Sequence, residues 1–230
     1  MKAWYFSSDD RRLRHGDERT IILGETHEVS GDIELCKRGL HACKKAIDAL
    51  TYAPGPVVYR VELSGKIEKG EDKLVAQKRT YLSGGIDVSE TLRKFARMCA
   101  LDVVDMWEAP EVVIRYLKTG DKSIRAAAQD AARSVSWSAA HVTADYTVQS
   151  AALAVARAAA RDDAQFNADY AVRAAAVASV EYAVWNESLA TAQAAIEYAA
   201  QDEARRKQNK RLTSMIARAI RDANFGGTND

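Results

Sequence analysis

The stretch PVVYRVEL, residues 56–63, decides the fold of the N-terminal part of this chain. Large apolar side chains fall on every second position, and polar side chains enter only at the alternate positions. One set is Val57, Tyr59, Val61 and Leu63, and the other is Val58, Arg60, Glu62 and Ser64. Because successive side chains of a strand point to opposite faces, this period of two predicts a strand with one face buried.

Neighbouring segments extend this strand into a β-rich module that we expect to span residues 1–88. Three further strands are predicted, at 3–6 (AWYF), 19–23 (RTIIL) and 73–82 (KLVAQKRTYL). We expect SGKIEKGEDK, residues 64–73, to be a turn-rich connection, and SGG, residues 83–85, to close the last strand.

The apolar period changes from two to that of a helix at Asp87. Asp87 and Glu90 have the spacing of a capping box, which satisfies free amides at a helix start. Apolar residues then share one face as far as Pro110, namely Leu92, Phe95, Ala96, Cys99, Val103, Met106 and Trp107. Cys99 is therefore predicted to be a buried thiol. A short helix is predicted from Pro110 to its cap Gly120, so residues 89–120 are connecting helices.

Alanine occupies 30 of the 84 positions between residues 121 and 204, and the order repeats every 24 residues. Asp121, Asp145 and Asp169 align, as do Ile124, Val148, Val172 and Ile196. One helix of roughly 17 to 20 residues plus a turn fits this period, with each aspartate near a helix N-terminus. We expect an antiparallel helical stack over 121–222, followed by a flexible tail over 223–230. Two short helices per unit, or one long alanine-rich helix, are the alternatives.

The last helix of this stack is predicted from LTSMIARAI, residues 212–220, and is expected to end near Phe225. Its apolar side chains recur at helical spacing and form one stripe, made of Leu212, Met215, Ile216, Ala219 and Ile220.

Composition and charge limit the class of protein. With 230 residues and 47% apolar side chains the chain can bury a core, and no apolar run is long enough to span a bilayer. Three cysteines without a recognisable signal peptide predict a soluble, cytoplasmic protein that does not contact a membrane. The net charge is +1, but the charges are distributed unevenly along the chain. Residues 121–204 contain 11 acidic and 6 basic residues, whereas residues 205–230 contain 7 basic and 2 acidic residues.

One cluster combines thiols, an imidazole and cations, in LCKRGLHACKKAIDALTYAPG at residues 35–55. Cys36, His41 and Cys43, together with His27 upstream, are candidate metal ligands, although zinc sites normally place paired ligands two or three residues apart. Alternatively, Cys43 is a nucleophile whose pKa is lowered by a helix start and by the two lysines that follow it.

We favour a structural interpretation of the same cluster. In it, Gly39 allows a left-handed turn, and Leu40 and Ala42 pack inward. The two cysteines are small buried side chains, and His41 hydrogen-bonds the local backbone. This interpretation predicts no catalytic residue, no metal and no cofactor.

The run CKRGLHAC, residues 36–43, with IDALTYAPGPVVYRVELSGKI and KLVAQKRTYL after it, resembles an uncharacterised family found mainly in bacteriophages and prophages. Members of that family combine a small β-rich module, built around G-[LF]-H-A, with an alanine-rich helical extension. The resemblance covers residues 1–120. It implies a phage accessory protein that acts in the cytoplasm of a bacterial host, and it implies no reaction.

The sequence therefore predicts an α+β protein that binds a partner and catalyses no reaction. We expect it to inhibit a bacterial host or defence protein, in an anti-CRISPR-like or other anti-defence role, through its helical stack. The expected contact residues are basic, namely Lys37, Arg38, Lys44, Lys45, Arg205, Arg206, Lys207, Lys210 and Arg211.

Other functions stay open at this point. The basic C-terminal helix would bind nucleic acid through phosphate contacts. An enzyme similar to ADP-ribosyltransferases would use Arg60 or His41, although the sequence contains no P-loop, dinucleotide-binding or metalloprotease motif. Trp137 and Trp185 share a column of the repeat, and if both face outward they would form the contact of a homodimer.

Overall fold

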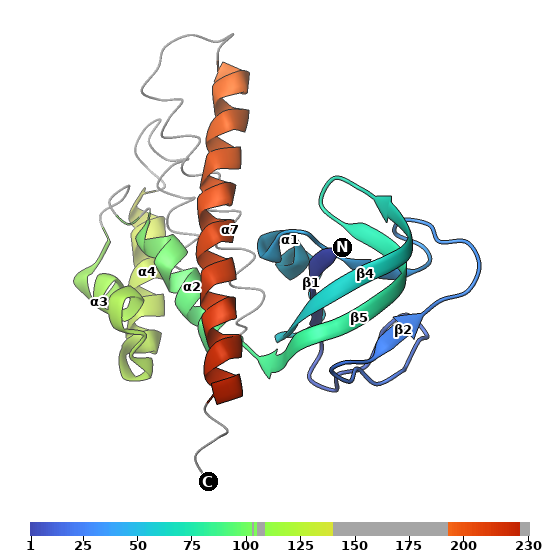
Figure 1. Ribbon diagram of the computed structural model, residues 1–230. Coiled ribbons are helices and arrows are strands. Elements are labelled where there is room, and N and C mark those ends of the chain that lie inside the picture. The colour runs from blue at the N-terminus through green and yellow to red at the C-terminus, as the bar shows by residue number, and fades with distance from the viewer. Residues whose placement is uncertain (103, 105–108, 140–192, 226–230) are drawn as a thin grey trace. The chain divides into compact units, whose positions relative to one another are not determined.

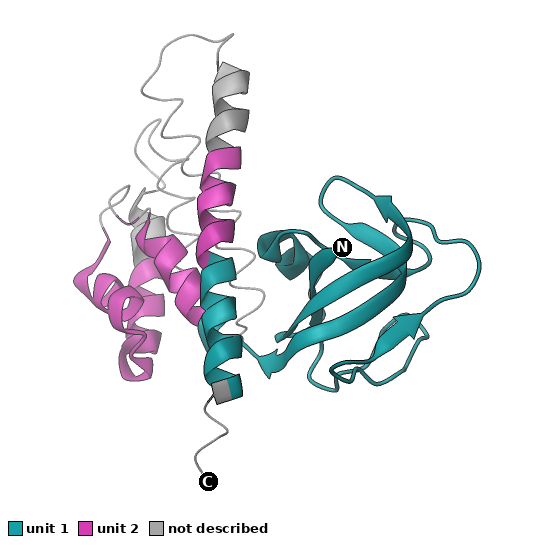
Figure 2. Cartoon of the chain, viewed as in Figure 1, with its two compact units in different colours: residues 1–91, 212–230 teal, residues 92–211 magenta. Residues whose placement is uncertain are grey.

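The structure is a computed structural model that describes residues 1–102, 104, 109–139 and 193–225 (Figure 1). An antiparallel sheet precedes a series of helices, so the chain belongs to the α+β class, as expected. It divides into two compact units, one of residues 1–91 with 212–230 and one of residues 92–211 (Figure 2). No helix within the described ranges combines the length and the apolar character that crossing a membrane requires.

Five antiparallel strands form the sheet of the first unit. They are β1 (Lys2–Ser7), β2 (Thr26–Glu28), β3 (Leu40–Ala42), β4 (Val57–Lys69) and β5 (Leu74–Asp87). Their order is β1-β4-β5-β2, and β3 pairs with β5 as well. The strands predicted at 3–6, 56–63 and 73–82 are thereby confirmed.

A further pairing links the two ends of this sheet. The Trp4 amide donates to the Cys43 carbonyl at 2.7 Å, and the Cys43 amide donates to the Trp4 carbonyl at 3.0 Å. Because Cys43 directly follows β3, the chain of pairings runs from β1 through β4, β5 and β3 back to β1. Part of the buried apolar side chains form a cluster that includes Ala3, Leu40, Ala42, Val57, Tyr59, Val61, Leu63, Leu74, Ala76 and Tyr81. Such a small closed sheet leaves few free edges and encloses its core.

Two predictions about the strands are wrong. Residues 19–23 form no strand, since only Thr20 makes an isolated bridge, and that bridge is with Arg12. The segments 64–69 and 83–85, expected to be turns, instead belong to β4 and β5. The reason is that glycine also occurs in irregular strands, where β-bulges use positive φ angles. Gly84 adopts a φ of 102° at such an irregularity, opposite Tyr59.

Two helices follow strands of the sheet along the chain, and each has one end that differs from the prediction. Helix α1 (Ala46–Thr51) begins three residues after Cys43, so Cys43 does not lie at a helix start. Helix α2 (Ser89–Leu101) starts where the Asp87 carboxylate accepts a hydrogen bond from the Ser89 amide at 2.7 Å. It ends at Leu101, whereas the predicted helix extended to Pro110. Cys99 is fully buried within α2, as predicted.

The second short helix ends where the sequence predicts. Helix α3 (Glu111–Thr119) follows Pro110 and ends at Gly120, which adopts the left-handed conformation with a φ of 70°. This confirms the predicted start and cap, because glycine carries no Cβ that would oppose a positive φ at a helix end.

The alanine-rich region is described only at its two ends. A 3-10 turn, η2 (Lys122–Ile124), leads into α4 (Arg125–Ala139), and Asp121 caps it by accepting from the Ser123 amide at 2.9 Å. This is the capping role predicted for the first aspartate of the repeat. The remaining columns of the 24-residue repeat, with Asp145, Asp169 and Trp185, lie outside the described residues.

The last helix, α7 (Gln193–Phe225), ends at Phe225 as predicted but begins well before residue 212. Leu212, Ile216 and Ile220 of its expected apolar stripe are buried. In the second unit, Arg211 of α7 makes a two-pronged ion pair with Asp102, with N···O distances of 2.7 and 3.0 Å.

Candidate functional site

The first unit contains a cavity of about 600 Å³. Its walls come from β1, β3, β5, the loops that precede β2 and β3, and the segment around α1. Basic side chains predominate among its polar residues, which include Arg14, His15, Asp17, Lys37, Arg38, His41, Lys73 and Arg79. A cavity of this volume is in the range that holds small molecules.

Arg79 of β5 is the most deeply buried cation of the lining, with 2% of its surface exposed. Its Nε and Nη2 groups donate to the Tyr81 hydroxyl at 3.1 and 2.8 Å, and Nη1 donates to the His41 carbonyl at 2.5 Å. The guanidinium also stacks on the ring of Tyr5, 3.7 Å from its centroid. These contacts hold the guanidinium plane in one orientation.

The hydroxyl of Tyr81 links Arg79 to His27 by hydrogen bonds. Since arginine can only donate, this oxygen accepts from Arg79 and gives its own hydrogen to His27 Nδ1, 3.0 Å away. Burial raises the pKa of Tyr81 to about 12. Burial also lowers the pKa of His27, and the charges of Arg19 and Arg79 lower it further. Both partners are therefore neutral at pH 7.

The positive charge of Arg79 consequently has no anionic partner within the described part of the chain. Its hydrogen bonds go to a phenol and to a backbone carbonyl, and no described carboxylate lies within ion-pair distance. An arginine carries five N–H donors, and these bonds use three of them. Two N–H groups of a buried cation thus have no acceptor among the described residues.

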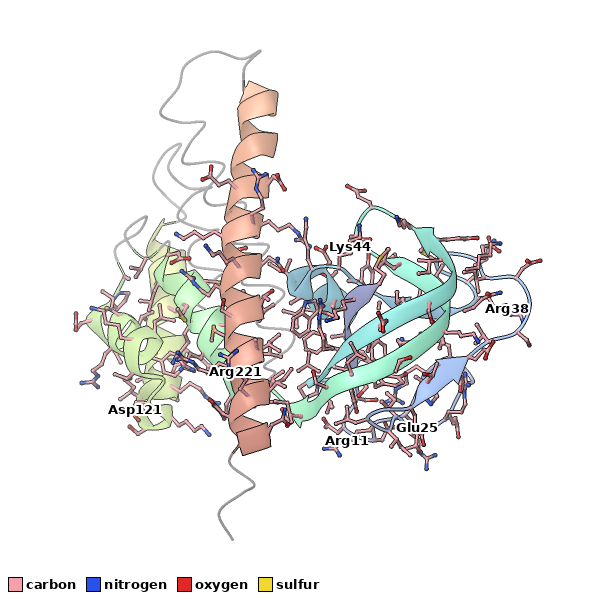
Figure 3. All side chains as sticks on the ribbon, viewed as in Figure 1. Arg11, Glu25, Arg38, Lys44, Asp121 and Arg221 are labelled. Carbon is pink, nitrogen blue, oxygen red and sulfur yellow. The ribbon has the colours of Figure 1, made fainter. Side chains whose placement is uncertain are left out.

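Among the described residues of the lining, Asp17 is the one carboxylate, and it is already paired. Both of its oxygens accept from Arg19, at 2.9 and 2.7 Å. Among the exposed cations, Lys37 pairs with Glu34 at 2.6 Å. Arg38, which is labelled in Figure 3, donates to the Ser30 carbonyl at 2.7 Å.

Lys73 adds a second cation without a carboxylate partner among the residues described. Its ammonium lies over the ring of Tyr52, 4.1 Å from the centroid. Burial lowers the pKa of Lys73, but hydrogen bonds with Cys36 and Tyr52 outweigh it and raise the pKa overall. The Tyr52 hydroxyl donates to Asp72 at 2.5 Å, which holds this aromatic ring in place at the cavity.

His41 has the structural role that the sequence suggests. Its Nε2 accepts a hydrogen bond from the Cys36 amide at 3.1 Å, so the predicted bond to local backbone is confirmed. Burial lowers the pKa of His41, and the charges of Lys73, Arg79 and His15 lower it further. A hydrogen bond with the Gly39 backbone acts in the opposite direction and raises this pKa, but the pKa is lowered overall. Three cationic or basic groups therefore converge around this imidazole.

The cysteines correct two predictions. Cys36 is exposed, although we expected it to be buried, because it lies in the tight turn that the Glu34–Arg38 bridge closes. Cys43 is buried as expected, but its pKa is raised to about 12 by burial and by the charges of Asp48 and Asp72. A thiol nucleophile at Cys43 would need a lowered pKa, so that alternative is wrong.

The residues considered as metal ligands also have separate roles. His27 bonds Tyr81, His41 bonds the Cys36 amide, and Cys43 is buried beside α1. Across the described residues, no three His, Cys, Asp or Glu side chains are grouped in a way that could hold a metal ion.

These environments predict the reactivity of the three thiols. At pH 8, a pKa of about 12 leaves Cys43 and Cys99 almost entirely protonated, with roughly one thiolate in ten thousand. We therefore expect an aromatic disulfide reagent to modify only the exposed Cys36 rapidly in the native protein. The colour released should correspond to one thiol before denaturation and to three after it. Rapid release of two or more equivalents from the native protein would contradict this assignment.

The basic residues expected to contact a partner divide into several groups. Lys37 and Arg38 line the cavity, whereas Lys44 and Lys45 are exposed beyond it. On α7, Arg211 is engaged by Asp102, and Arg206 pairs with Asp202 at 3.1 Å. Arg205, Lys207 and Lys210 complete the set on this helix.

Arg60, the alternative catalytic residue, lies outside the lining that contains His41. Its guanidinium covers the Trp4 ring, 4.7 Å from the centroid, and burial lowers its pKa. The structure therefore does not place Arg60 and His41 in the same cavity.

Sequence reasoning missed Arg79 and Tyr81, although a signal was present. Both fall in KLVAQKRTYL, two positions apart, and so share a face of the predicted strand. Both are buried, and Tyr81 belongs to the apolar core. An arginine on the buried face of a strand is unusual, because charged side chains are rarely buried without a partner.

Comparison with known proteins adds one finding. Residues 18–94 match a family model described as a domain of unknown function (DUF7666). No curated protein and no solved structure matches the chain. The match covers His27, His41 and the Arg79–Tyr81 pair, so most of the cavity lies within it. It agrees with the expected resemblance to uncharacterised proteins, while the phage connection stays a prediction.

Proposed function

We propose that the chain is a non-enzymatic binding protein whose N-terminal unit holds a small anionic molecule in the cavity beside Arg79. One observation carries the proposal, namely that a cation with 2% exposure has only neutral partners among the described residues and lines a cavity of about 600 Å³. A buried charge is costly unless an opposite charge or strong hydrogen bonds compensate it. A bound anion would supply that compensation.

The shape of arginine suits this role. A guanidinium presents parallel N–H groups that match the oxygens of a phosphate or a carboxylate, and such charge-assisted bonds are stronger than neutral ones. One edge of Arg79 is occupied by Tyr81, and the stack on Tyr5 holds the plane. The remaining N–H groups are therefore already oriented before a ligand arrives, which lowers the entropic cost of binding.

The neighbouring polar groups support binding over catalysis. Tyr81 and His27 use their hydrogen-bonding atoms on each other and on Arg79, and His41 uses Nε2 on the Cys36 amide. A general acid or base needs a proton that it can exchange with the ligand. These three groups instead maintain the position of the cation.

Ligand-dependent stability tests the proposal directly. Pyrophosphate, titrated into the full chain at constant ionic strength, should raise the thermal midpoint, because it binds the folded state only. At a concentration one hundredfold above Kd the stabilisation is about 2.7 kcal/mol. This corresponds to a rise of several degrees for a protein of this size. If calorimetric titration shows no heat of binding and the midpoint does not move with any phosphate compound, the proposal fails.

A second candidate rests on Lys44 and Lys45, which are exposed and do not line the cavity. Lys44 is labelled in Figure 3. Together with the resemblance to phage and prophage proteins, this pair of lysines supports a protein that binds a bacterial host protein and inhibits it. Capture of one host protein by the wild-type chain, and its loss after the double substitution Lys44→Glu and Lys45→Glu, would support this candidate. Equal capture by both chains would exclude these lysines as the contact.

A further inference from the structure

We infer that the molecule held by Arg79 is a mononucleotide, with its terminal phosphate on Arg79 and Lys73 and its base on Tyr52. This inference rests on the proposed function and gives it a ligand class. Three observations lead to it, namely the volume of the cavity, the number of unpaired cations and the accessibility of one aromatic ring.

The volume shows that the ligand is larger than a simple anion. The cavity of about 600 Å³ extends from the buried Arg79 to the partly exposed Tyr52. An inorganic phosphate fills only a small part of such a space, whereas ligand pockets of roughly 300 to 1,000 Å³ hold drug-sized molecules. The apolar part of the lining, including Leu13 and Pro54, suits the ring system of a larger ligand.

The charges indicate a group with two negative charges. Arg79 and Lys73 both line the cavity, and neither has a carboxylate partner among the described residues. Both act electrostatically on the same imidazole of His41, and Arg79 also bonds its carbonyl. A phosphate monoester carries close to two charges at pH 7 and has three terminal oxygens, so it can contact both cations. A monocarboxylate can neutralise only one of them.

The aromatic side chains of the described lining differ in how exposed they are. Arg60 lies over the Trp4 ring, Arg79 over the Tyr5 ring and Lys73 over the Tyr52 ring, but Tyr52 is the most exposed of the three. Tyr52 is 47% exposed, and its hydroxyl is fixed by Asp72. Stacking of a nucleobase on such a ring is tolerant of base identity and contributes about 1 to 3 kcal/mol. We therefore expect preference for a base without strong preference among bases.

The depth of Arg79 favours a free nucleotide over a nucleic acid. A guanidinium with 2% exposure can be reached by a terminal phosphate that enters the cavity. An internal phosphodiester is flanked by nucleotides on both sides and carries only one charge. Nucleic-acid binding normally relies on exposed basic surfaces that follow the backbone.

Calorimetric titration of the full chain with four compounds tests the inference. AMP should bind most tightly, and ribose 5-phosphate, which lacks the base, should bind roughly tenfold more weakly. Adenosine, which lacks the phosphate, should bind about 100-fold more weakly than AMP. GMP should bind within a few fold of AMP.

Three substitutions assign the contacts. Tyr52→Leu should remove the advantage of AMP over ribose 5-phosphate and leave ribose 5-phosphate binding unchanged, whereas Tyr52→Phe should keep that advantage. Lys73→Met should weaken both phosphates roughly tenfold. Lys44→Met, which removes an exposed lysine outside the lining, is the matched control and should change neither.

The outcomes distinguish the nucleotide inference from the proposed anion site at Arg79 on which it rests. Equal affinities for AMP, ribose 5-phosphate and pyrophosphate would overturn the nucleotide assignment and leave an anion site at Arg79. Tighter binding of a 5′-phosphorylated oligonucleotide than of AMP would also overturn it. Absence of binding by every phosphate compound would refute both.

Discussion

Replacement of Arg79 by methionine is expected to abolish measurable anion binding, with a loss of at least about 100-fold in affinity for pyrophosphate. Methionine keeps much of the length and packing of the arginine stem but removes the charge and all five donors. The cavity then offers only Lys73 and peripheral cations to the ligand. Titration calorimetry at fixed ionic strength measures the loss directly.

The same substitution should have a much smaller effect on folding. It removes hydrogen bonds to Tyr81 and His41, each worth about 1 kcal/mol, but it also removes a buried charge without an anionic partner. These effects oppose each other, so the free energy of unfolding should change by no more than about 2 kcal/mol. Urea denaturation without ligand measures this change and shows that the variant is folded.

Two further variants separate the charge of Arg79 from its shape. Arg79→Lys keeps a cation but loses the planar fork, so its affinity should fall between wild type and Arg79→Met. Lys44→Met removes an exposed charge outside the cavity and should bind like wild type. A folded Arg79→Met protein that binds pyrophosphate normally would place the anion elsewhere.

Substitution of Gly84 by alanine is expected to destabilise the first unit by about 3 to 5 kcal/mol, the sum of backbone strain and steric overlap. Gly84 has a φ of 102°, which side-chain-bearing residues rarely adopt. A Cβ at this position would lie 2.3 Å from the Val58 carbonyl oxygen and 3.0 Å from the Tyr59 Cα. Both atoms belong to the backbone of β4, so neither can move without disturbing the strand pairing.

Gly24 provides a matched control for this effect. It has a similar positive φ of 86°, but a Cβ there would meet no atom within 4 Å. Gly24→Ala should therefore cost only about 1 kcal/mol, from backbone strain alone. Thermal denaturation of the full-length variants compares the two. Equal losses would show that the close approach of β5 to β4 at Gly84 is not a constraint.

The sequence predicted the local elements well where one signal lies within a few residues. The alternation in residues 57–63, the helix start after Pro110 and the left-handed cap at Gly120 depend only on neighbouring residues, and the structure confirms them, except that Val58 is also buried. The extension of β5 through Gly84 and Gly85 was missed, because glycine pairs occur in turns and in bulges alike. Only the partner strand distinguishes the two.

The candidate site could not be predicted from local sequence patterns, because it depends on contacts between residues far apart in the sequence. Cys36, His41 and Cys43 were considered as a site because thiols and imidazoles are chemically reactive. In the structure, however, Cys43 is buried and its pKa is raised, and His41 accepts a hydrogen bond from the Cys36 amide. Arg79 looked like an ordinary strand residue. Its role depends on a contact with His41, which lies 38 positions away in the sequence. It also depends on Tyr81, whose own partner His27 lies 54 positions from that tyrosine.

The sequence by itself determined the α+β class, most of the alternation of β4 and the two ends of α3, because strand period and helix caps act over a few neighbouring residues. The tertiary structure decided that Arg79 is buried, that its partners are neutral and that it lines a cavity. Pairing β5 with β2 and β3 brings these groups together. The free energy of a buried charge depends on all groups around it, which no single stretch of sequence contains.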